Sequence, residues 1–168
     1  GDTFLAALQQ GKIAAGMTTE PTVQRAIGSG AAKLAIDLRT PEETRKALGG
    51  DYPAACLYMD RGWMEANKVT VQKVVNALVK TLKWIASHSA DEIADKMPKD
   101  YYAGDRALYV QGLTEGKPQY SPDGMMPQGA PESVNKILAS FSPNVQGKTI
   151  DLSKTYTTEF VVKANAGQ

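Results

Sequence analysis

Short apolar runs alternate with amphipathic segments through residues 1–40, and this alternation is the feature that most restricts the fold. Residues 13–17 and 31–38 are apolar runs whose length fits buried strands better than helices. Residues 3–10 and 21–27 carry apolar side chains at helical spacing, and a glycine follows each segment. This order of helix, strand, helix and strand, with short glycine-marked junctions, predicts an α/β fold with a parallel sheet.

The rest of the chain is predicted to be mainly helical. A capping box at residues 40–43 should begin a helix that ends near Leu48. Residues 52–59 form a further apolar run, which we interpret as a strand or a crossover segment. A regular apolar stripe predicts the longest helix, over residues 68–87. Shorter helices are expected after a second capping box at Ser89 and near residues 105–114 and 131–141.

The 168 residues fit one domain or parts of two. The change from alternating strands and helices to mainly helices falls near residues 39–51. We therefore expect two lobes, with residues 1–45 in one and residues 46–168 in the other. The chain starts with Gly1 and carries no segment of the signal-peptide type, so we expect it to be a processed or truncated piece.

Composition argues against several classes of function. The 19 Lys and Arg against 18 Asp and Glu leave a formal charge of +1, which is unlike a nucleic-acid-binding surface. No apolar run approaches the ~20 residues of a membrane-spanning helix. One cysteine and one histidine allow neither an internal disulfide nor a multi-histidine metal site, so we expect no metal and no cofactor. Cys56 lies in an apolar run and is expected to be buried and unreactive.

The loop at residues 16–21 is the best candidate for a binding site. It joins an expected strand to an expected helix, and ligands of open α/β sheets bind beyond that edge. Thr18 and Thr19 offer hydroxyls beside the unpaired N–H groups of the helix start, whereas Glu20 would attract an ammonium or an amino-heterocycle. Asp37 ends the next expected strand and would reach the same place. In the structural alternative, Thr19 or Glu20 only caps the helix and Asp37 is a solvated carboxylate.

Four stretches of the sequence resemble a known family. Residues 4–21, which read FLAALQQGKIAAGMTTEP, look like a segment of the solute-binding proteins of ABC importers for nitrate, sulfonates, taurine and thiamine-type pyrimidines. Residues 52–85 are similar to a strand, a short helix and a long helix of the same family, and residues 123–127 and 150–160 match its C-terminal end. The resemblance implies a periplasmic-binding-protein type II-like fold. This chain would supply the end of the second lobe and the helix-rich return into the first.

The same resemblance implies a function. The chain would be part of a periplasmic or lipid-anchored protein that captures a small polar organic ligand between two lobes for an ABC permease. Thr18, Thr19 and Glu20 match the family's ligand loop, and no covalent chemistry is expected. We also consider self-association of a truncated chain. Two other functions stay open: an enzyme that makes a thiamine pyrimidine precursor, with His88 as its one candidate histidine, and an independent α/β interaction module.

Overall fold

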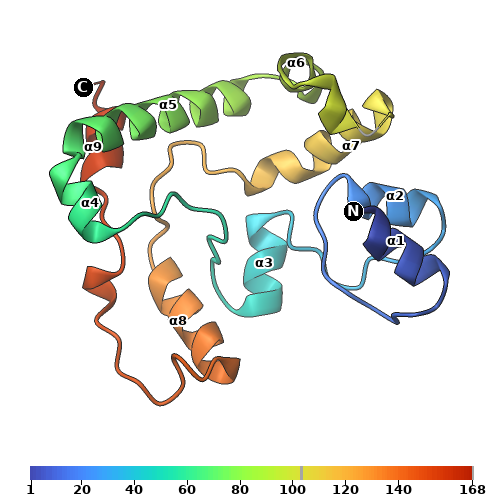
Figure 1. The fold of residues 1–168 in the computed structure, drawn as a ribbon, viewed down its shortest axis with the longest axis horizontal. Coiled ribbons are helices and arrows are strands. Elements are labelled where there is room, and N and C mark those ends of the chain that lie inside the picture. Colours follow the sequence, from blue (N-terminus) through green and yellow to red (C-terminus); the bar gives the residue numbers. More distant parts are fainter. Residues whose placement is uncertain (103, 168) are drawn as a thin grey trace. The chain divides into compact units, whose positions relative to one another are not determined.

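The computed structural model describes residues 1–102 and 104–167. All regular secondary structure within these residues is helical (Figure 1). This finding contradicts the α/β fold predicted from the sequence, because the described residues contain no strand. The periplasmic-binding-protein type II-like sheet that the resemblance implied is wrong for this chain.

The three predicted strands are irregular segments. Residues 13–17, 31–38 and 52–59 have apolar sequences, but a strand also needs a neighbour to share its backbone hydrogen bonds. In the described part of the chain, no backbone hydrogen bond joins one of these segments to another. Many of their apolar side chains are exposed, with Tyr58 at 88%, and none is buried. Cys56, which the sequence predicted to be buried, is exposed, as are the residues on both sides of it, 54–58.

The predicted helices, by contrast, are confirmed. Helix α3 spans Pro41–Leu48 and the longest helix, α5, spans Lys68–Ser87. Helix α6, Ala90–Lys96, begins with the predicted capping box: the Ser89 hydroxyl accepts from the Glu92 backbone N–H at 3.2 Å, and the Glu92 carboxylate accepts from the Ser89 N–H at 2.8 Å. These elements form as predicted because their signals are local and need no distant partner.

The chain divides into two compact units, each made of two segments. Unit 1 comprises Gly1–Thr40 and Ser87–Tyr120, and unit 2 comprises Pro41–Ala86 and Ser121–Gln168. The two lobes expected from the sequence, residues 1–45 and 46–168, stay a prediction.

Unit 1 is built around helix α7. This helix packs against α2, α6 and two short 3₁₀ helices, and α1 packs against α2. The buried positions Gly112 and Gly116 lie four residues apart, on one face of α7. A Cβ atom at Gly112 would lie only 3.2 Å from a carboxylate oxygen of Glu20, so glycine allows this close approach. The elements of unit 1 not bounded above are α1 (Asp2–Gln9), α2 (Thr22–Gly28), η1 (Lys99–Tyr102), α7 (Arg106–Gly116) and η2 (Lys117–Gln119).

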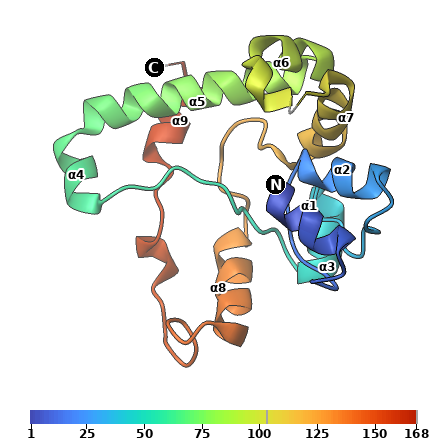
Figure 2. The ribbon, with the colours of Figure 1, turned by 45° about the vertical axis from the view of Figure 1, so that its right-hand side comes forward.

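Unit 2 has its core between α5 and α9, which lie side by side in both ribbon views (Figures 1 and 2). Val71 and Val79 of α5 are buried, as are Phe160 and Val161 of α9. The Gln72 side chain links the two helices by donating to the Phe160 carbonyl at 2.8 Å. None of the described helices is long and apolar enough to cross a membrane. The other elements of unit 2 are α4 (Arg61–Ala66), α8 (Ala130–Phe141), η3 (Leu152–Lys154) and α9 (Glu159–Asn165).

Candidate functional site

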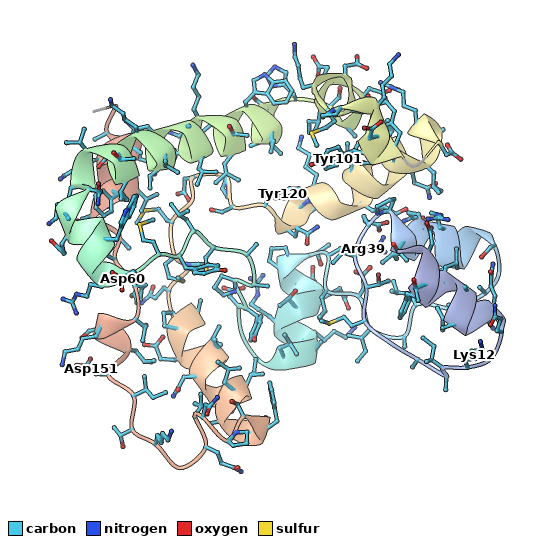
Figure 3. The ribbon with its side chains drawn as sticks, viewed as in Figure 1. Lys12, Arg39, Asp60, Tyr101, Tyr120 and Asp151 are labelled. Carbon is cyan, nitrogen blue, oxygen red and sulfur yellow. The ribbon has the colours of Figure 1, made fainter. Side chains whose placement is uncertain are left out.

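Arg39 gathers three carboxylates within unit 1. Its Nε and Nη2 donate to the two oxygens of Asp37 at 2.9 and 2.8 Å, which makes a two-pronged ion pair. Its Nη1 donates to Glu20 at 3.1 Å and also to Glu115. We call Arg39, Glu20, Asp37 and Glu115 the Arg39 cluster. Figure 3 shows Arg39 where α2 and α7 approach each other.

Local backbone structure places each carboxylate of the Arg39 cluster. Glu20 directly precedes α2, and its second oxygen accepts from the Gln24 backbone N–H at 3.2 Å. Asp37 accepts from the backbone N–H two residues later at 2.9 Å, which makes a tight local turn. Glu115 lies on α7 and accepts from the side chains of Gln24 at 2.6 Å and Gln111 at 3.1 Å. The cluster therefore joins three separate segments of unit 1.

The cluster is partly shielded from solvent and carries an excess of negative charge. The side chains of Arg39 and Glu20 are 18% and 19% exposed. The hydrogen bond from Arg39 lowers the pKa of Asp37 below its usual range. The pKa of Glu115 is also lowered, first by the hydrogen bond from Gln111 and then by Arg39. Three carboxylates facing one guanidinium leave a formal charge of −2.

This arrangement offers hydrogen-bond acceptors rather than a reactive group. The three carboxylates have lone pairs beyond those that accept from Arg39, so they can accept from N–H groups of a ligand. The cluster contains no thiol, hydroxyl or imidazole that would serve as a nucleophile. Within residues 1–102 and 104–167, no group of three or more His, Cys, Asp or Glu side chains is arranged to hold a metal ion.

The structure brings together two of the four residues that the sequence singled out. Glu20 and Asp37 meet at Arg39. Thr18 is half-buried and Thr19 is exposed, and neither side chain forms a hydrogen bond in the described part of the chain. The Thr19 carbonyl accepts from the Thr22 N–H at 3.0 Å, so Thr19 serves the start of α2 through its backbone. A binding role for any of these four residues stays a prediction.

Sequence reasoning missed Arg39 and Glu115. Arg39 had a local signal, because an aspartate two residues before an arginine can pair with it across a turn. Glu115 had no such signal, since it lies 76 residues from Arg39 along the chain and reaches it only through the packing of α7.

Comparison with known proteins gives one informative match. No protein-family model matches the chain, and no curated protein matches it significantly. A solved structure of a protein from Bordetella bronchiseptica RB50 is similar, with 36% sequence identity and a TM-score of 0.91. The match covers 97% of this chain but 51% of that protein, so the chain spans about half the length of the protein that it matches.

Proposed function

We propose that the chain is part of the solute-binding component of an ABC importer and that the Arg39 cluster contacts the ligand. The observation that carries the proposal is the meeting of Glu20 and Asp37 on one guanidinium. Glu20 is the charged residue of the loop that resembles the family's ligand loop, and Asp37 is the other carboxylate that the sequence predicts beside that loop. Both candidate carboxylates thus share one partly buried, charged cluster.

The charge of the cluster supports a ligand with hydrogen-bond donors. A formal charge of −2 in a partly shielded place repels a nitrate or a simple sulfonate and attracts an ammonium or an aromatic amine. Of the ligand classes that the resemblance implies, taurine and an amino-pyrimidine carry such a group. We therefore propose an amine-bearing small polar molecule rather than a simple anion.

No covalent step belongs to this proposal. The protein would bind its ligand outside the cell membrane, as a periplasmic or lipid-anchored component, and deliver it to a membrane permease. The Arg39 cluster would supply only part of the ligand's surroundings. The half-length match with the Bordetella protein supports this point, because a similar fold occurs there within a chain of about twice the length.

Isothermal titration calorimetry tests the proposal. Taurine, 4-aminopyrimidine, methanesulfonate and nitrate are titrated into the chain at neutral pH. We expect binding of taurine or 4-aminopyrimidine, and we expect Glu20→Gln to weaken it about tenfold through the loss of one charge-assisted contact. The matched control is Glu42→Gln, which makes the same change at an exposed position of α3 in unit 2. Equal affinity of the two variants would remove Glu20 from the site, and no binding of any compound by the unaltered chain would overturn the proposal.

A further inference from the structure

Helices α4 and α5 of unit 2 carry a concentrated positive charge. Residues 61–87 contain five basic side chains and a single acidic one, Glu65, which gives this stretch a formal charge of +4. The whole chain has a charge of +1, so the remaining residues together carry −3. The chain is therefore nearly neutral as a whole, but its charge is unevenly distributed along the sequence. The basic residues of the stretch are Arg61, Lys68, Lys73, Lys80 and Lys83.

Three of these lysines form one stripe along α5. Lys73, Lys80 and Lys83 are seven and three residues apart, which places them along one side of a helix. All three are exposed, and Lys73 and Lys80 lie on the side of α5 away from the buried positions Val71 and Val79, whereas Lys83, four residues after Val79, lies at the edge of that side. Lys73 and Lys80 have no carboxylate within ion-pair distance in residues 1–102 and 104–167. The helix itself contains no acidic residue.

Apolar side chains accompany this stripe. Val69 is 72% exposed and lies four residues before Lys73, and Val74, which directly follows Lys73, is 42% exposed. On α4, Trp63 is about half exposed. We call the exposed side of α5, with Val69, Lys73, Val74, Lys80 and Lys83, the basic face.

We propose that the basic face docks onto the surface of an anionic lipid bilayer. Lysine side chains would pair with lipid phosphates, while Val69, Val74 and the indole of Trp63 would enter the boundary between headgroups and acyl chains. Charge complementarity favours an acidic partner, and the exposed aliphatic groups favour lipid over nucleic acid, because a phosphate backbone offers them nothing apolar to contact. Docking of this kind lies on the surface and needs no spanning helix.

Vesicle cosedimentation tests the proposal on the chain as it is. The chain is mixed with vesicles of phosphatidylcholine alone, or of phosphatidylcholine and phosphatidylglycerol in equal amounts. We expect binding only to the anionic vesicles, and release at high salt. The double variant Lys73→Glu with Lys80→Glu should weaken binding at least about 25-fold, from about fivefold for each lysine lost. The control variant, Lys96→Glu with Lys99→Glu, makes the same charge change at exposed positions of unit 1 and should still bind.

Two further measurements separate lipid from other acidic partners. Val69→Ser with Val74→Ser keeps every charge, and a loss of vesicle binding by this variant supports entry of apolar groups into the bilayer. Unchanged binding by this variant, or tighter binding to polyglutamate or duplex DNA than to anionic vesicles, would overturn the lipid assignment. The proposal is also overturned if the unaltered chain does not bind anionic vesicles. It is likewise overturned if the Lys73→Glu, Lys80→Glu variant and the Lys96→Glu, Lys99→Glu control bind these vesicles equally well. None of these results depends on the Arg39 cluster, so they leave the transport proposal untouched.

Discussion

Replacement of Arg39 by alanine removes the one cation that three carboxylates of unit 1 share. The two-pronged contact with Asp37 contributes about 1.5 kcal/mol, as a charge-assisted and partly shielded ion pair. The single contacts with Glu20 and Glu115 add about 0.5–1 kcal/mol each, the latter being the more exposed. We therefore expect Arg39→Ala to lower the free energy of unfolding by about 3 kcal/mol at neutral pH.

The effect of Arg39→Ala on the free energy of unfolding should depend on pH, and this dependence tests the prediction most directly. Asp37 and Glu115 have lowered pKa values in the folded chain, so their stabilising contribution is present above the usual carboxyl pKa of about 4 and disappears as pH falls through the lowered values. Urea unfolding followed by circular dichroism should show the full difference at pH 7 and almost none at pH 2. A difference below about 0.5 kcal/mol at pH 7, or one that persists unchanged at pH 2, would refute this account of the cluster.

Three further predictions concern local structure. Ser89→Ala removes the hydroxyl of the α6 capping box and should cost about 1 kcal/mol in thermal unfolding, with faster amide exchange in the first turn of α6. Phe160→Ala should lower the free energy of unfolding by about 3–4 kcal/mol because this side chain is buried. Phe141→Ala, at an exposed position, should change it by no more than about 0.5 kcal/mol. Equal effects of the two variants would contradict the placement of the unit 2 core. Arg106→Gln breaks exposed ion pairs to α6 and one exposed hydrogen bond to the Asp91 carbonyl, so its unfolding midpoint should match that of the unaltered chain.

The helices could be predicted from the sequence because their signals lie within a few residues of one another. The stripe of α5 and the capping box at Ser89 each specify an element without reference to the rest of the chain. The apolar runs contain no local signal that specifies a strand. An apolar run such as residues 31–38 states only that the segment favours burial, and whether it becomes a strand depends on a partner elsewhere.

The candidate site was predictable to the same limited extent. Glu20 and Asp37 could be selected because each lies at the end of a short apolar run. Glu115 could not be selected, because it reaches Arg39 only through the packing of α7 against α2, which the α/β prediction did not contain. The hydroxyls of Thr18 and Thr19 were chosen as donors beside a helix start, yet in the described residues they make no side-chain hydrogen bond. Arg39 and Glu115 are 76 residues apart in the sequence, so no local pattern indicates that they form an ion pair.

Native mass spectrometry of the chain as purified tests the central claim most directly. If the Arg39 cluster contacts a transported solute, the spectrum should contain a second species whose added mass belongs to a small compound with a basic amine. That species should be absent from Glu20→Gln with Asp37→Asn and present in Glu42→Gln. A bound compound that survives the double substitution, or one that is a simple anion without an amine, would contradict the account.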